Sequence, residues 1–543
     1  MSYIFDELMK LSRQTGKSLK TISLELHIPY STVSKWKIRE PHVKYKYKIY
    51  NYIEYEREKL MTTPRQVFSS KGEYTTTSEE IPVYDEDNIP NDFWDKLKSV
   101  YLGHKDGNKN WETEEPVLRN IIISMANQLK DQGYRILSPI DTGGTAVILK
   151  IRYEHLNVIR ALKFARPIEK HKDLFVEIMT TEIGYLLEAS HKNIVEIYFQ
   201  GEIDTDFGKC PFYIMEFVKG AQSATKYFEK KRNVQDLIII LKQVVSAIKH
   251  LHSKSIVHLD IKPDNILVSS EGNALLSDLG SARKYDETDE EVTIIYSKPY
   301  AHPKLTEIKW DSTSDSNRNR GYIKRKELDK RFDIYAFGKA VIELIDYFDP
   351  NVITERMPAY ERKYLYLMAC RSLDGLNTDD YTALGLPRDI FKELKYRSFD
   401  EIADDLDKLT GEFPLDRLLP ELNPYIIDIV QTGSNWKTPL TKRLLNLLTH
   451  PSLQRLTSVS QLGLLTHVYP TATHTRLQHT LGVFSNTIRI IEALYNDSIN
   501  PLFKQIMNIK DLECLLLASL FHDIGHFPLA HDLHDAIDSI FKP

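Results

Sequence analysis

Four polar residues in the middle of the chain have the types and spacing needed to move a phosphoryl group. Asp260 is followed by Lys262 and Asn265, and Asp278 comes eighteen residues after Asp260. An aspartate can orient an attacking hydroxyl and accept its proton, and a lysine can neutralise the transferring phosphoryl. We expect Asp260, Lys262 and Asn265 to be catalytic. We expect Asn265 and Asp278 to hold the magnesium ions that bridge the phosphates of ATP.

The two segments that carry these residues, 258–268 and 278–280, resemble the catalytic and metal-binding loops of protein kinases. The resemblance runs from about Tyr134 to about Leu409. It implies a bilobal kinase fold that transfers the γ-phosphate of ATP to a hydroxyl of a protein substrate. A lysine two residues after the aspartate is the pattern of the serine/threonine kinases.

The same resemblance places the parts that bind ATP. Segment 140–148 resembles the loop that covers the phosphates, and segment 213–218 resembles the hinge strand that hydrogen-bonds adenine. Lys163 corresponds to the strand lysine that grips the phosphates, and Glu182, in a helical run, to its partner. The expected nucleotide-binding residues are Ile140, Gly143, Gly144, Ile148, Lys163, Glu182, Met215, Glu216, Val218 and Asp278.

Three departures from the kinase pattern remove no catalytic group. Leu259 replaces the arginine that usually precedes the aspartate, so no cation is present there to dock a phosphorylated loop. Lys304 stands where the family has a glutamate, and the polar insertion Ser312–Arg320 is predicted to be a mobile surface loop. Each motif alone has an ordinary explanation as a hairpin turn or a surface charge. Their order favours an active kinase, and a pseudokinase that binds ATP is the alternative.

The amino end predicts a helix-turn-helix. In residues 18–37, Leu19, Ile22 and Leu26 fall on one face of a first short helix, and Val33 and Trp36 on one face of a second. The segment resembles DNA-binding modules of the phage-repressor and transposase-resolvase type, and residues 1–60 hold 12 Lys and Arg against 7 Asp and Glu. A protein-interaction module is the alternative. The expected DNA contacts are Ser31, Thr32, Ser34, Lys35 and Lys37.

The carboxyl end carries an imidazole–carboxylate set. His522 and Asp523 are adjacent in an apolar helical run, and His479 lies in an earlier one, a donor set suited to a divalent transition metal. The flanking residues 476–483 and 520–531 resemble HD-domain phosphohydrolases, most closely the deoxynucleoside-triphosphate triphosphohydrolases. A hydrogen-bonded core pair is the ordinary explanation of an isolated His-Asp.

By that resemblance, manganese or iron would be bound by His479, His522 and Asp523. The expected dNTP contacts are Gln461, Leu462, Arg476, His526 and His531. The chain ends at Pro543, and the family takes a further Asp ligand from a later segment. We therefore expect an incomplete HD site that binds metal weakly and hydrolyses dNTPs poorly or not at all.

Length and composition predict a multidomain α+β protein of the cytoplasm. The 543 residues carry a net charge of −5, and Cys210, Cys370 and Cys514 are too few and too scattered for a disulfide framework or a zinc site. No apolar run is long enough to span a membrane and no secretory signal is visible. The predicted parts are an all-α helix-turn-helix head (1–60), a flexible linker (61–90), a helical connector (91–133), the bilobal kinase domain (134–410), a second linker (411–435) and a partial all-α HD domain (436–543).

Three functions remain open on the sequence alone. The first is a serine/threonine kinase with a DNA- or partner-binding head and a phosphohydrolase-like tail. The second is a pseudokinase that controls the HD module, and the third is a nucleotide phosphohydrolase that the kinase regulates. The sequence does not predict the protein substrate of the kinase or the oligomeric state.

Overall fold

The computed structural model describes residues 8, 12, 19, 22, 89–103, 111–142, 145–166, 172–205, 208–286, 288–307, 318–348, 357–373, 394–423, 429–431, 437–463, 468–471 and 473–526. These residues form two compact units. The first holds the chain up to Gly220 together with Asp278–Ser281, and the second holds Ala221–Ser277 and the chain from Ala282 onward. The DNA contacts predicted in the head, Ser31, Thr32, Ser34, Lys35 and Lys37, lie outside the described residues.

The first unit is built on a five-stranded antiparallel sheet with strand order β1-β2-β3-β5-β4. Its strands are β1 (Tyr134–Thr142), β2 (Ala146–Tyr153), β3 (Val158–Ala165), β4 (Ile197–Thr205) and β5 (Gly208–Glu216). The register pairs Lys163 of β3 with Ile148 of β2 on one side and with Tyr213 of β5 on the other. Lys163 therefore lies on a central strand that has hydrogen-bonded neighbours on both edges.

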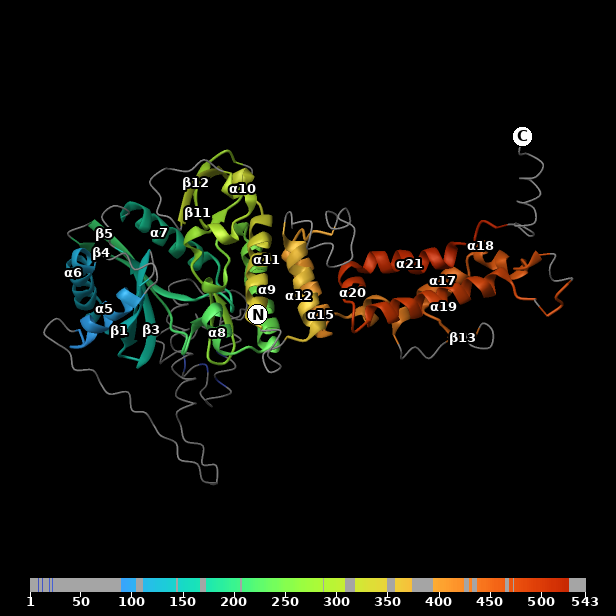
Figure 1. The fold of residues 1–543 in the computed structure, drawn as a ribbon, viewed down its shortest axis with the longest axis horizontal. Coiled ribbons are helices and arrows are strands. Elements are labelled where there is room, and N and C mark those ends of the chain that lie inside the picture. The colour runs from blue at the N-terminus through green and yellow to red at the C-terminus, as the bar shows by residue number, and fades with distance from the viewer. Residues whose placement is uncertain are drawn as a thin grey trace, which may run out of the picture. The chain divides into compact units, whose positions relative to one another are not determined.

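Helices cover both faces of this sheet (Figure 1). Leu162 and Phe164 are fully buried in one apolar core with α5 (Phe93–Gly103) and α6 (Trp111–Lys130). Side chains alternate between the faces of a strand, so Lys163 points to the opposite face. There it meets α7 (Lys172–Glu188), which carries Glu182. The described residues of the predicted helical connector 91–133 are mostly helical and share their core with the sheet.

The second unit begins with a mostly helical region. Its longest helices are α9 (Val234–Ser253), α11 (Arg331–Asp346), α12 (Ala359–Ser372) and α15 (Phe399–Thr410), with the shorter α8 (Ala224–Lys230) and α10 (Pro303–Thr306). Asn233 caps α9 by accepting hydrogen bonds from the amides of Gln235 and Asp236, which fixes where that helix begins. The sheet-rich first unit and this helical region agree with the kinase fold expected from the sequence.

Short strand pairs hold the loops between these helices. β6 (Gln222–Ser223) pairs with β8 (Ile266–Val268), which also pairs with β9 (Ala274–Leu276). The other pairs are β7 (Ile256–Val257) with β10 (Arg283–Lys284) and β11 (Glu291–Ser297) with β12 (Arg318–Lys324). Residues 318–320 of the insertion are thus part of a strand, whereas the sequence predicts a mobile loop over Ser312–Arg320. These polar residues form a strand because they pair with β11. Residues 312–317 lie outside the described residues.

The tail of the second unit is helical and has a core of its own. It contains α16 (Leu415–Leu418), α17 (Lys442–Leu448), α18 (Pro451–Gln454), α19 (Arg476–Tyr495), α20 (Leu502–Ile506) and α21 (Ile509–Phe521), with the strand pair β13 (Ile429–Gln431) and β14 (Lys437–Pro439). Leu419 and Leu422 are buried in this core, although they fall in the predicted linker 411–435. Buried Glu421 adds an ion pair with Arg443. The stretch Leu419–Leu422 of that predicted linker is therefore packed structure.

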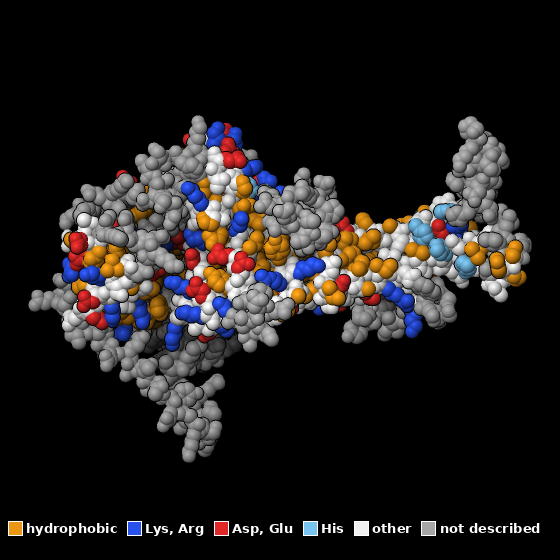
Figure 2. All heavy atoms as spheres, viewed as in Figure 1, with side chains coloured by type: hydrophobic (Ala, Val, Ile, Leu, Met, Phe, Trp, Pro, Cys, Tyr) orange, Lys and Arg blue, Asp and Glu red, His pale blue; other side chains and the backbone are white. Residues whose placement is uncertain are grey.

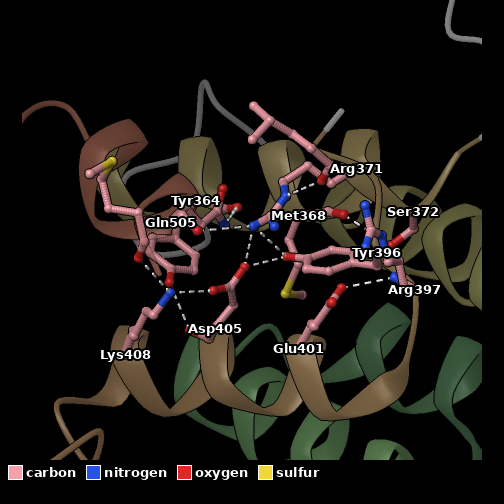
Figure 3. Close-up of polar contacts among 12 residues, drawn as sticks. Tyr364, Met368, Arg371, Ser372, Tyr396, Arg397, Glu401, Asp405, Lys408 and Gln505 are labelled. Atoms are coloured by element: carbon pink, nitrogen blue, oxygen red, sulfur yellow. Dashed lines mark hydrogen bonds and ion pairs between the residues drawn. The ribbon is translucent and has the colours of Figure 1, made fainter. Parts of the chain in front are cut away.

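A buried polar network joins the tail to the helical region (Figure 3). Asp405 of α15 accepts from Arg371 and Lys408 at 2.5 and 2.9 Å. Arg371 also donates to the carbonyl of Gln505 at 3.1 Å, and the Gln505 amide donates to the carbonyl of Tyr364 at 2.9 Å. Gln505 is buried in α20, so its backbone carbonyl needs a hydrogen-bond donor from the protein. The charged side chains of α12 and α15 therefore also donate hydrogen bonds to backbone carbonyls of the tail.

Among the described residues, no helix is both long enough and apolar enough to cross a membrane. The three cysteines are free thiols, with Cys210 and Cys370 buried and Cys514 exposed.

Candidate active site

In the first unit, Lys163, Glu182 and Asp278 come together as the sequence predicts. Lys163 Nζ lies 2.8 Å from both carboxylate oxygens of Glu182 and 3.6 Å from Asp278 Oδ1. Burial raises the pKa of the Glu182 carboxyl, and the neighbouring Lys163 ammonium opposes that rise. The Lys163 ammonium is thus fixed by two oxygens at the central strand of the sheet.

The turn that carries Asp278 is packed against the helix that carries Glu182. Asp278 has a φ of 61°, a left-handed conformation that non-glycine residues rarely adopt. A Cβ added at Gly280 would lie 2.5 Å from Ile178 Cγ2 of α7, so a side chain at this position would push the turn off the helix. The glycine of the Asp-Leu-Gly motif is therefore required by this close approach.

The other predicted nucleotide-binding residues of this unit lie on the sheet and just after it. Ile140 on β1 is exposed, Ile148 on β2 is half-buried, and Met215 on β5 is buried. Glu216 ends β5, and Val218 follows it; both are half-buried. Gly143 and Gly144 lie outside the described residues.

In the second unit, Asp260, Lys262 and Asn265 form one hydrogen-bonded cluster. Asp260 Oδ2 lies 2.7 Å from Lys262 Nζ and 3.1 Å from Asn265 Nδ2. The backbone amide of Ser297 donates to Asp260 Oδ1 at 3.0 Å, and Lys262 Nζ lies 2.8 Å from the Ser297 hydroxyl. Asp260 is buried, and polar contacts orient both of its oxygens. The sequence predicts the first three residues but not Ser297.

A buried carboxylate holds the backbone that leads into this cluster. Asp333, fully buried at the start of α11, accepts hydrogen bonds from the amides of His258 and Leu259, both at 2.8 Å. Its Oδ2 also lies 2.8 Å from His252 Nε2. Burial alone would raise the pKa of Asp333, but the hydrogen bond with His252 and the amide of His258 lower it. Asp333 thereby fixes Leu259, whose φ is 66°.

Two further polar residues belong to the described structure but carry no sequence signal. Arg166, just past the end of β3, forms a buried ion pair with Glu114 of α6 at 2.8 Å and a hydrogen bond with Tyr101 of α5. Glu114 lies 52 residues earlier in a segment without a motif, so spacing could not identify it.

The predicted metal ligands of the tail also come together. His522 Nε2 lies 3.3 Å from His479 Nε2 and 3.8 Å from Asp523 Oδ1, and His479 Nε2 lies 4.0 Å from Asp523 Oδ2. One atom from each residue falls within 4.8 Å of the others. His522 Nδ1 lies 2.9 Å from the Ser519 carbonyl, which leaves Nε2 as the ligand atom. Figure 2 shows histidine side chains gathered on the surface of the tail.

The predicted dNTP contacts surround this cluster only in part. Arg476, at the first turn of α19, is buried and donates to Asp523 Oδ2 at 3.0 Å. His526 Nδ1 lies 3.3 Å from Asp523 Oδ1. Gln461 and Leu462 are half-buried. The backbone amide of Gln461 donates to the carbonyl of His474, near the start of α19. His531 lies outside the described residues.

Comparison with known proteins identifies the centre of the chain. Residues 134–377 match the family model of the protein kinase domain. A probable serine/threonine-protein kinase, MRK1 homolog, of Encephalitozoon cuniculi is 26% identical over 227 residues, which are 41% of this chain and 63% of the relative. The centre of the chain is therefore a protein kinase domain with serine/threonine kinases among its relatives.

Other curated relatives share the same central region. The serine/threonine-protein kinase shk1/pak1 of Schizosaccharomyces pombe is 27% identical over 237 residues, 44% of this chain and 32% of the relative. The serine/threonine-protein kinase AtPK1/AtPK6 of Arabidopsis thaliana is 22% identical over 240 residues, 44% of this chain and 47% of the relative. The chain spans less than two thirds of each of these relatives. The helix-turn-helix and HD interpretations stay predictions.

Proposed function

We propose that this chain is a serine/threonine protein kinase that transfers the γ-phosphate of ATP to a protein hydroxyl. The observation that carries the proposal is the pairing of the predicted catalytic groups within each unit. Lys163 is paired with Glu182 in the first unit. In the second, Asp260 is held by Lys262, Asn265 and Ser297. These contacts support an active kinase over a degenerate one.

The proposed reaction needs one proton acceptor and one cation from the second unit's cluster. The oxygen of the substrate hydroxyl bonds to the γ-phosphorus of ATP, and Asp260 accepts the proton of that hydroxyl. The bond from the γ-phosphorus to the bridging oxygen of ADP breaks. Lys262 neutralises charge on the transferring phosphoryl. Ser297 is hydrogen-bonded to both Lys262 and Asp260 and so keeps the two side chains next to each other. Lys163 positions the phosphates of ATP that do not react.

The residues proposed to hold magnesium fit that ion. Carboxylate and amide oxygens are the ligands that magnesium prefers, and bound magnesium neutralises the phosphates of ATP. The Asn265 amide nitrogen donates to the backbone oxygen and the side chain of Asp260, at 2.8 and 3.1 Å, so the amide oxygen is the atom directed to a cation. Asp278 supplies the carboxylate.

Transfer of labelled phosphate from magnesium-ATP to the chain or to a protein substrate tests the proposal. Asp260→Ala and Lys163→Met should lower the rate by about a hundredfold or more. Asp264→Ala is the matched control, because Asp264 is an exposed aspartate of the same loop. Equal incorporation by wild type and Asp260→Ala would refute the assignment. A wild-type chain that binds ATP without transfer would favour the pseudokinase.

We also propose that the tail binds manganese or iron through His479, His522 and Asp523, as in HD phosphohydrolases that act on dNTPs. Two imidazoles and a carboxylate converge there, and burial lowers the pKa of His479, which favours the neutral, ligating form. Hydrolysis of a dNTP with release of triphosphate, lost in His522→Ala, tests the activity. No release by the wild-type chain would leave metal binding as the function of the cluster.

For the head we propose DNA binding, supported by the excess of Lys and Arg in residues 1–60. Binding to duplex DNA should weaken steeply with salt, and Lys35→Glu with Lys37→Glu should weaken it across all sequences. Association that does not depend on salt would favour a protein-binding module.

A further inference from the structure

The segment that leads to Ser297 is paired with a strand, β12, that begins in the polar insertion and continues beyond it. β11 runs antiparallel to β12, from Glu291 opposite Lys324 to Ser297 opposite Arg318. The residues of β11 are therefore held by a partner that lies later in the chain. The inference drawn from this pairing rests on the proposed kinase function.

Arg325, directly after β12, contacts this segment at two separated points. Its backbone amide donates to the Glu290 carbonyl at 2.9 Å, and its Nε lies 2.8 Å from Glu290 Oε2. Its Nη1 donates to the carbonyl of Lys284 on β10 at 3.0 Å. One guanidinium thus links β10 to the beginning of β11.

An apolar cluster anchors the same hairpin to the residue before Asp260. Leu259 is buried in one cluster with Val292 and Ile294 of β11 and Ile323 of β12. An arginine at position 259 would offer a cation to a phosphorylated segment, whereas leucine offers only packing. At Leu259 the hairpin therefore contacts the catalytic loop through apolar side chains.

The far end of the hairpin reaches the catalytic cluster. Ser297, the last residue of β11, donates its amide to Asp260 and contacts Lys262 through its hydroxyl. The neighbouring Tyr296 is buried and donates to the carbonyl of Leu305 at 2.9 Å. A displacement of β11 would move Ser297 away from both catalytic side chains.

We propose that Arg325 and strand β12 are positioning elements that hold residues 282–286 and 288–297 in the catalytic conformation without a phosphate on that segment. The insertion replaces the phosphate-dependent ordering that a cation at position 259 would provide. Arg325 acts through Ser297 and is not itself a catalytic residue.

Steady-state kinetics of phosphatase-treated protein test this proposal. Arg325→Ala should lower kcat about tenfold with little change in the KM for ATP, because charge-assisted hydrogen bonds are lost away from the nucleotide. Arg325→Lys should restore part of kcat. Arg135→Ala is the matched control: its side chain is 24% exposed and pairs with Glu154, while that of Arg325 is 20% exposed and pairs with Glu290. Thr288→Ala and Thr293→Ala should retain activity.

An inactive phosphatase-treated chain that recovers on phosphorylation of Thr288 or Thr293 would overturn the proposal. So would an unchanged kcat in Arg325→Ala. If wild type transfers no phosphate at all, the kinase assignment fails instead, and amide hydrogen exchange decides the hairpin separately. Exchange in residues 291–297 should rise in Arg325→Ala and stay at the wild-type level in Arg135→Ala; no rise would contradict the positioning role.

Discussion

The helical region and the tail each contain a buried aspartate beside histidine, and the two carboxylates have different surroundings. Asp333 contacts His252 and the backbone amides of His258 and Leu259, all at 2.8 Å. Asp523 contacts Arg476 at 3.0 Å and faces imidazoles at 3.3 to 4.0 Å. The first carboxylate is saturated by short bonds, and the second is surrounded by potential ligand atoms.

The exposure of the histidines differs in the same sense. The His252 side chain is 6% exposed, whereas His479 and His522 are 37% and 35% exposed. A buried carboxylate that receives backbone amides fixes a loop, while exposed imidazoles around a carboxylate can admit an ion. Identical residue types therefore support different roles, and the partners of the carboxylate decide between them.

The largest effect should follow removal of the saturated carboxylate. Asp333→Ala leaves two buried amides without an acceptor, so we expect a loss of about 3 kcal/mol in the free energy of unfolding. Denaturant unfolding measures it. Asp329→Ala, which removes a partly exposed partner of Arg331, is the control and should cost much less. Equal losses in the two variants would contradict the structural role of Asp333.

Removal of a tail ligand should affect metal binding and leave phosphate transfer unchanged. In His522→Ala we expect manganese affinity to fall at least about tenfold, because one of three ligand atoms is lost. Isothermal titration with manganese measures the affinity. His450→Ala, at a capping histidine of the tail, is the control. Unchanged affinity in His522→Ala would show that the cluster is a hydrogen-bonded core set.

A smaller effect tests whether the two regions unfold together. Gln505→Leu removes the donor to the Tyr364 carbonyl and should cost about 1 kcal/mol. Gln454→Leu, which removes an exposed bond to the Leu448 carbonyl, is the control. Unfolding followed by fluorescence and by circular dichroism should shift together in Gln505→Leu. Separate transitions would show that the tail unfolds independently.

The smallest expected effect is a change in how folding stability depends on pH under acidic conditions. Because the folded-state pKa of Asp333 lies below its ordinary value of 3.8, its contribution to stability is present above that value and is lost as pH falls through the folded pKa. Stability measured as the pH falls from about 5 to about 2, the range in which a carboxyl with a lowered pKa loses its contribution, should fall less steeply in Asp333→Asn than in wild type. Parallel curves would contradict the lowered pKa.

Sequence reasoning identifies the residues whose spacing is local. Asp260, Lys262 and Asn265 lie within six residues, and the structure brings them together. Lys163 and Glu182 are paired correctly because a strand and the following helix limit where the partner can lie. The candidate metal site of the tail is likewise recognisable in the sequence, because His522 and Asp523 are adjacent.

The contacts that sequence reasoning misses depend on long-range packing. Arg166 meets Glu114 across 52 residues, and a segment without a motif gives no reason to choose that glutamate. The start of β12 is expected to be a loop because its residues are polar, and its pairing with β11 follows from a neighbour rather than from its own propensity. Tertiary partners of this kind cannot be obtained from a local pattern.

The most direct test of the kinase assignment is the identity of the phosphorylated amino acid. Lys262, two residues after Asp260, is the sequence pattern of the serine/threonine kinases, so we expect transfer to serine or threonine. After incubation with labelled magnesium-ATP, hydrolysis of the wild-type protein should yield phosphoserine or phosphothreonine, and Asp260→Asn should yield neither. Phosphotyrosine in the wild type, or equal labelling of Asp260→Asn, would contradict the account.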